Sequence, residues 1–144
     1  MEGNPFSLKF NFEPGKVHQL QRNIRRIIAP NGSPMTFTGT NTYLVGNQNL
    51  AVIDPGPNIK AHLNSILASV SLNQTITHIL ITHSHIDHSP LAKILQEKTN
   101  APIYAFGDSF SGRSKMMMEL TKKGDLKGGE GLDKDFSPDV YVKD

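Results

Sequence analysis

Short apolar runs separated by clusters of Gly, Pro and Asn set the expected layout of this chain. Strands are predicted where aliphatic and β-branched residues gather, and helices where apolar residues recur every three or four positions. The expected strands cover residues 17–29, 41–46, 50–54, 75–81 and 102–106, with the beginning of another over 136–142. The expected helices cover 58–70 and 90–100, with a short one through Met116 and Leu120. Strands alternating with helices indicate an α/β fold.

Composition places bounds on function. The chain has 144 residues, 37% hydrophobic residues and a net charge of +2, which gives no electrostatic case for nucleic acid or a membrane surface. It has no cysteine, so nitrogen and oxygen are its strong metal-ligand atoms. Residues 1–5 show no basic start or apolar run, and no stretch approaches the ~18 apolar residues of a membrane span. We therefore expect a cytoplasmic protein without a membrane partner.

One polar run carries the chain's most informative chemistry. Residues 83–88 read His-Ser-His-Ile-Asp-His, three imidazoles and a carboxylate directly after an apolar strand. Such ligands suit zinc, iron or manganese. If strand geometry continues, His83 and His85 face the same way, while Asp87 and His88 turn toward a neighbouring position after a bend. The pattern predicts two adjacent metals, which can share a hydroxide and polarise a substrate oxygen.

Other polar residues have simpler interpretations. His18, His62 and His78 are isolated histidines, and we interpret them as surface or packed core residues. Asp54 ends a strand before a Pro-Gly pair, so a turn residue and a carboxylate beside the metals are equally good readings. Residues 39–41 either shape a loop by the site or form an ordinary turn.

Several segments resemble one known family. Residues 83–88 resemble the HxHxDH motif of the metallo-β-lactamase-fold superfamily. Residues 35–46 and 52–56 are similar to two upstream segments of its hydrolase branch of β-lactamase-like protein 2, and residues 131–136 are similar to that branch too. The resemblance covers about residues 17–144. It implies the N-terminal half of an αββα sandwich, that is, one mixed sheet with flanking helices.

The resemblance also implies roles for single residues. His83 and His85 would ligate one metal, and Asp87 and His88 the other. Asp87 would also be catalytic, since it would orient the attacking hydroxide. Asp54 would support the metals without ligating them. The implied cofactor is zinc, one or two ions in a complete site, with iron or manganese as alternatives.

The chain departs from the family's plan after the motif. No histidine follows His88, whereas the family takes further histidines and a bridging aspartate from its second half. We therefore expect residues 1–144 to form a single truncated domain of this type, with a flexible loop region over 107–131. Its inner sheet face would expose apolar strands, so a homodimer or the missing C-terminal half is expected to cover it.

Three functions stay open at this level. The first is a metal-dependent hydrolase, in which metal-activated hydroxide attacks an ester, thioester, lactone or phosphodiester; the chain alone is expected to be inactive. The second is a non-catalytic remnant or fragment with weak metal binding. The third is a relative of mononuclear iron dioxygenases. The small net charge favours a small-molecule substrate over RNA.

Overall fold

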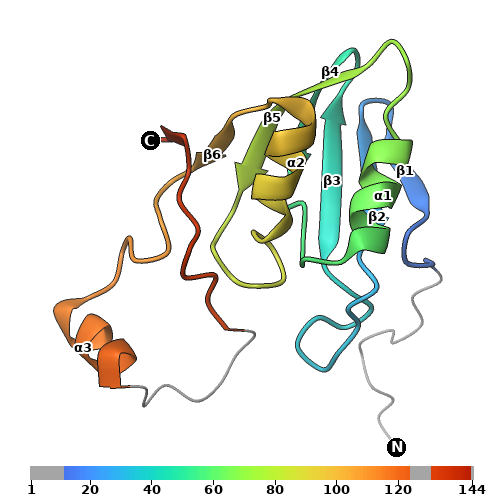
Figure 1. Cartoon of the computed structure of the whole chain (residues 1–144). Helices are drawn as coiled ribbons and strands as arrows, with labels where there is room; N and C mark the ends of the chain where they lie inside the picture. Colours follow the sequence, from blue (N-terminus) through green and yellow to red (C-terminus); the bar gives the residue numbers. More distant parts are fainter. Residues whose placement is uncertain (1–11, 124–130, 144) are drawn as a thin grey trace, which may run out of the picture.

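The computed structural model describes residues 12–123 and 131–143, and these form one seven-stranded mixed sheet with three helices (Figure 1). The strands follow one another in the sheet in chain order. They are β1 (Val17–Gln21), β2 (Ile24–Ile28), β3 (Asn41–Gly46), β4 (Asn49–Ile53), β5 (Thr75–Ile81), β6 (Ile103–Ala105) and β7 (Val140–Tyr141). The helices are α1 (Lys60–Ala68), α2 (Leu91–Thr99) and α3 (Lys115–Lys123). None of these helices is long and apolar enough to cross a membrane.

The direction of the strands changes at β4. Strands β1 to β4 pair antiparallel, and β4 to β7 pair parallel. Helix α1 connects β4 to β5 and α2 connects β5 to β6, as parallel neighbours require a crossover. The carboxyl ends of β4, β5 and β6 therefore meet at one edge of the sheet. Because β3 runs antiparallel to β4, the beginning of β3 lies at that edge too.

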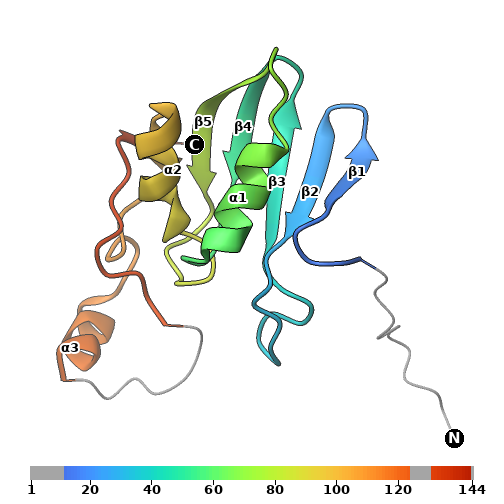
Figure 2. The same ribbon diagram turned by 45° about the vertical axis from the view of Figure 1, so that its right-hand side comes forward.

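One face of the sheet forms the core with α1 and α2, which both lie on that side (Figures 1 and 2). Four residues in register across β3 to β6 point toward the helices and are at most 3% exposed: Leu44, Val52, Ile79 and Ile103. The helices contribute Leu63, Ile66, Leu91 and Leu95 to the same cluster. Helix α2 ends where Asn100 takes the left-handed conformation, at φ 58°.

The other face of the sheet is less covered. Successive strand residues point to opposite faces, so the neighbouring row in register lies on the side away from α1 and α2. This row, which we call the outer row, is Tyr43, Ile53, Leu80 and Tyr104. All four side chains stay partly exposed, and no second sheet packs on them among the described residues.

Most predicted elements are confirmed, within one or two residues. One prediction is wrong: residues 17–29 form two antiparallel strands, because polar Arg22 and Asn23 make a tight turn between them. The strand predicted over 136–142 is reduced to β7, since Pro138 lacks the N–H that a ladder needs. The short helix is confirmed as α3. Residues 124–130 lie outside the described residues, and the flexibility of 107–131 stays a prediction.

Candidate metal centre

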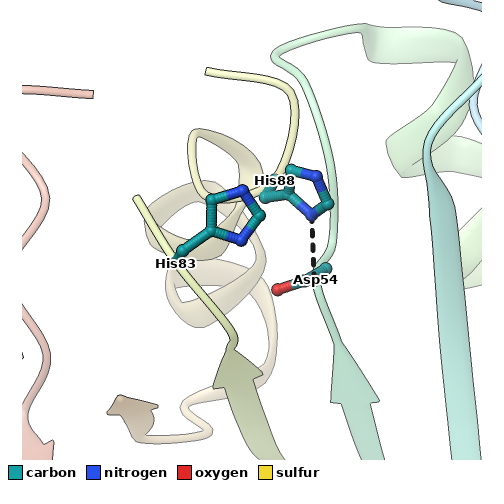
Figure 3. A group of neighbouring side chains, drawn as sticks. All are labelled: Asp54, His83 and His88. Atoms are coloured by element: carbon teal, nitrogen blue, oxygen red, sulfur yellow. Dashed lines mark hydrogen bonds and ion pairs between the residues drawn. The ribbon is translucent and has the colours of Figure 1, made fainter. Parts of the chain in front are cut away.

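The candidate centre lies at the carboxyl ends of β4 and β5, where Asp54, His83 and His88 come together (Figure 3). Each offers one ligand atom, and the three atoms lie within 4.8 Å of one another. Asp54 follows β4 in the left-handed conformation, at φ 49°. Backbone bonds tie its loop to the loop after β5: Gly56 N–H donates to the carbonyl of His88 at 2.9 Å.

The Asp54 carboxylate is an anchor for the loop after β5. Asp54 is 6% exposed, and its carboxylate accepts three hydrogen bonds. Thr82 donates its backbone N–H to Oδ1 at 2.8 Å and its hydroxyl to Oδ2 at 2.6 Å. Nδ1 of His88 lies 2.9 Å from Oδ2. A carboxylate only accepts, so Nδ1 of His88 carries the proton and Nε2 is left for another partner.

The same network orients His83. Its Nδ1 lies 2.9 Å from the Thr82 hydroxyl, whose one proton already goes to Asp54. Nδ1 of His83 therefore donates, and its Nε2 keeps a lone pair suited to a metal. The His83 ring centroid lies 4.1 Å from that of His88 and 4.6 Å from that of His85.

The surroundings of Asp87 fit a cation best. Its side chain is buried, and its Oδ2 accepts a hydrogen bond from the Thr40 hydroxyl at 3.0 Å. The same oxygen lies 3.2 Å from Nε2 of His88, so two acceptors face each other unless a proton or a metal lies between them. The second oxygen, Oδ1, is buried without a hydrogen-bond partner among the described residues. These donor atoms fit a divalent metal, because carboxylate and imidazole are its usual ligands.

The two central imidazoles differ in proton affinity. Burial, together with the charges of His88 and His85, lowers the pKa of His83 despite the nearby carboxylates. Burial also opposes protonation of His88, but the hydrogen bond to Asp54 and the charges of Asp54 and Asp87 outweigh it and raise the pKa of His88. In the metal-free protein a proton therefore occupies His88 more readily than His83.

The predicted ligands all lie at this edge, with some differences from the expected geometry. Strand β5 ends at Ile81, so the condition under which His83 and His85 would face the same way as strand residues is not met. Instead, His85 pairs with Leu132 in an isolated bridge, and Asp133 N–H donates to the Ser84 carbonyl at 2.8 Å. Backbone pairing with Leu132 and Asp133 thus holds Ser84 and His85 after β5 has ended. His85 lies beside His83 but outside the three-residue group, and the division of ligands between two metals stays a prediction.

Two threonines near the ligands, Thr40 before β3 and Thr42 within it, could not be found from the motif at residues 83–88. Thr40 accepts a hydrogen bond from the Asn31 amide at 3.0 Å and donates its own hydroxyl hydrogen bond to Asp87. Thr42 donates to the backbone carbonyl of Asp54 at 2.7 Å. The signal in the sequence was their spacing: Thr40 and Thr42 are two residues apart, and residues two apart in an extended segment point to the same face of a sheet.

Two hollows flank the ligands. One has a volume of about 270 Å³ and is lined by His83, His85 and the loop after β6, including Phe106 and Arg113. The other has a volume of about 320 Å³ and reaches Asp54, Asp87 and His88 from the β2–β3 loop, among other lining residues. Each hollow gives a small molecule access to one side of the ligand cluster.

Several known proteins are similar in sequence to part of this chain. A beta-lactamase-like protein 2 homolog from Caenorhabditis elegans is 36% identical over 97 residues, 61% of this chain and 32% of the relative. The Drosophila melanogaster homolog of the same name is 40% identical over 77 residues, 50% of this chain and 26% of the relative. An atrochrysone carboxyl ACP thioesterase from Aspergillus terreus is 35% identical over 75 residues, 51% of this chain and 23% of the relative. The chain thus matches a third or less of the length of each.

Solved structures confirm the fold. The subclass B3 metallo-beta-lactamase BJP-1 of Bradyrhizobium japonicum superposes with a TM-score of 0.56 at 23% identity, over 90% of this chain and 46% of that one. A mutant metallo-beta-lactamase from Cronobacter sakazakii gives 0.56 at 18% identity, over 91% and 48%. The predicted α/β class, one mixed sheet with flanking helices matching part of such a sandwich, is therefore confirmed.

The family assignment rests on the sequence match. The profile described as the metallo-beta-lactamase superfamily matches residues 35–110, more than half of the chain. That span contains Thr40, Asp54 and the whole of residues 83–88. This chain belongs to the metallo-beta-lactamase superfamily.

Proposed function

We propose that this chain provides part of a metal-dependent hydrolytic centre for ester-type substrates. The observation that carries the proposal is the buried Oδ1 of Asp87, which has no hydrogen-bond partner among the described residues and belongs to a carboxylate whose Oδ2 lies 3.2 Å from Nε2 of His88. An unpaired buried carboxylate oxygen is costly unless a cation or a water completes it. The proposal takes zinc as the metal, with His83, His85, Asp87 and His88 as ligands.

The residues have separate tasks in this proposal. A bound divalent metal supplies a Lewis acid and a water that is deprotonated near neutral pH. Asp87 would orient the attacking water, while the Thr40 hydroxyl holds its Oδ2. Asp54 ligates nothing, since Thr82 and His88 occupy its carboxylate, and it fixes the ring of His88. Such hydrogen bonds to ligands commonly govern metal affinity.

The substrate proposed is a small molecule with a carbonyl or phosphoryl group, such as an ester, thioester, lactone or phosphodiester. The hollow of about 320 Å³ beside Asp87 and His88 lies at the lower end of the size range of small-molecule sites, and the hollow of about 270 Å³ beside His83 and His85 lies just below that range. One relative is named a thioesterase, and this name supports including a thioester among the substrates proposed for this chain. A net charge of +2 offers little attraction for RNA.

The proposal also includes a partner for the outer row. Tyr43, Ile53, Leu80 and Tyr104 form an apolar band that neither α1 nor α2 covers. We propose that a second layer, a second copy of this chain or a further half-domain, packs there and completes the ligand set. This chain by itself is then expected to bind metal and to turn over substrate poorly.

Zinc titration of the purified chain tests the proposal. We expect saturable zinc binding that is lost in His83→Ala and His88→Ala. His78→Ala is the matched control, because His78 is an exposed strand residue that stacks on Tyr104 away from the ligands. Equal zinc binding by all four proteins would reject the centre. The zinc-loaded chain should then be assayed with a chromogenic thioester and a phosphodiester.

The same experiment separates the alternatives. Zinc binding without hydrolysis, even after a partner layer is supplied, would favour the non-catalytic remnant. Iron held in preference to zinc, together with oxygen uptake, would favour the dioxygenase. Hydrolysis that depends on zinc and on Asp87 supports the proposed function.

A further inference from the structure

A buried histidine outside the metal ligands is linked to them by hydrogen bonds. His62 lies on α1, is completely buried, and places Nε2 2.8 Å from the hydroxyl of Thr42. That hydroxyl lies 2.7 Å from the carbonyl oxygen of Asp54 and donates its one proton there. The hydroxyl must therefore accept from His62, so Nε2 of His62 carries the proton. The chain of bonds runs from α1 through β3 to the turn after β4.

The imidazole of His62 is not explained by packing. With the proton on Nε2, the other nitrogen Nδ1 is an acceptor, and it is buried without a partner among the described residues. An unpaired buried acceptor weakens folding, and an aliphatic side chain would fill the same space without that cost. Burial also lowers the pKa of His62 to about 4, so the ring is neutral near pH 7 and contributes no ion pair.

The turn that His62 contacts is shaped around the ring. Asp54 and Gly56 both have positive φ, 49° and 97°. A Cβ built on Gly56 would lie 3.1 Å from Cδ2 of His62, closer than a side chain normally packs. Asp54 is not glycine, so its left-handed conformation is strained and persists where surrounding contacts hold it. The Thr42 hydroxyl is such a contact, because it holds the carbonyl of Asp54 itself.

We propose that Thr42 and His62 form a positioning pair that fixes the Asp54 turn and, through the Asp54 carboxylate, the ring of the metal ligand His88. The proposal rests on the metal site of the proposed function. Neither residue of the pair touches metal or substrate. The link is geometric: the carbonyl of Asp54 is held by Thr42, while its carboxylate holds Nδ1 of His88.

Substitutions that keep or remove the hydrogen bonds test the pair. Thr42→Val and His62→Leu preserve size and remove the bonds, whereas Thr42→Ser and His62→Gln keep a hydroxyl and an Nε2–H donor. We expect zinc affinity, measured by competition with a chromophoric chelator, to fall about tenfold in the first two variants. Losses of this size are common when residues that orient metal ligands through hydrogen bonds are replaced. The two conservative variants should stay within about threefold of the unmodified chain.

Ile66→Ala is the matched control for stability. Ile66 lies on α1 one turn after His62, is completely buried, and belongs to the same core cluster. Its truncation should lower the urea midpoint without changing zinc affinity in the folded protein. If Ile66→Ala weakens zinc binding as much as Thr42→Val does, the effect is general loosening and the positioning proposal is wrong.

A metal-free measurement separates this proposal from the proposed function. In the apo protein, ¹⁵N NMR of the imidazoles should show Nδ1 of His88 protonated and hydrogen-bonded, and Thr42→Val should weaken that signature. If the chain binds no zinc, the proposed function fails, and the NMR comparison alone decides the pair. An unchanged His88 signature and unchanged affinity in Thr42→Val would overturn the pair. Thr42→Val also decides the matter if His62→Leu does not fold.

Discussion

Nδ1 of His88 lies 2.9 Å from Oδ2 of Asp54, so a carboxylate from the loop after β4 fixes a ring from the loop after β5. The two residues are far apart in sequence and meet because β4 and β5 are parallel neighbours. The contact selects which nitrogen of His88 is available to a metal. Asp54 thus governs the centre without ligating the metal in our proposal.

Replacing Asp54 by Asn should weaken this contact. The amide has one acceptor oxygen in place of two, so it cannot satisfy both Thr82 and His88. We expect zinc affinity to fall about 10- to 100-fold. The pKa of His88 should also fall, because the hydrogen bond and charge of Asp54 raise it. Chelator competition and NMR pH titration measure the two effects. A variant with unchanged affinity and unchanged His88 pKa would refute the anchoring role.

Replacing Asp87 by Asn should remove the unpartnered buried oxygen as a charged ligand. We expect fewer zinc ions per chain by mass spectrometry of metal content, and loss of any zinc-dependent thioester hydrolysis. Asp135→Asn is the control, since Asp135 is exposed and outside the ligand cluster. If both variants retain full zinc content, Asp87 is not a ligand.

Gly39 should not tolerate a side chain. Its φ is +132°, and an added Cβ would collide with the carbonyl oxygen of Ala29. We expect Gly39→Ala to lower the free energy of unfolding by about 2–4 kcal/mol, measured by urea denaturation, and to disturb the adjacent Thr40. Gly112→Ala is the comparison: its φ of +76° is also left-handed, but nothing lies within 4 Å, so about 1 kcal/mol is expected. Equal losses would contradict the collision.

His62 should make stability depend on pH. Its pKa is about 4 in the folded protein and near 6.5 when exposed, so the unfolded chain binds the proton more tightly. Its contribution is therefore complete above pH 6.5 and decreases as pH falls toward 4. Between pH 7.5 and 5 the loss should be about 2 kcal/mol relative to His62→Gln, measured by urea unfolding. Parallel pH profiles for the two proteins would show that His62 does not titrate in this way.

The outer row should drive association of this chain. Leu80 lies at its centre with Ile53 and Tyr104 on either side, all partly exposed. We expect sedimentation to show self-association at micromolar concentration, abolished by Leu80→Lys. Leu72→Lys is the control, because Leu72 is a fully exposed loop residue. A monomer at all concentrations would reject the second copy as the layer that covers this face.

Local patterns were enough for most elements of the fold. The apolar runs at 41–46 and 75–81 became β3 and β5 with the predicted bounds, since branched aliphatic residues between turn signals favour strands. The hairpin of β1 and β2 was missed, because Arg22 and Asn23 carry a weaker turn signal than a glycine would. The shortened β7 follows from Pro138.

The sequence by itself determined the chemical identity of the centre: three imidazoles and a carboxylate in residues 83–88 are recognisable wherever they fold. Tertiary structure decided how these groups are held. Asp54 and Thr40 hydrogen-bond His88 and Asp87, and the pair of Thr42 and His62 holds the Asp54 turn. No local spacing encodes those contacts. Strand order and direction bring them together, because side chains distant in sequence meet where parallel and antiparallel strands share one edge.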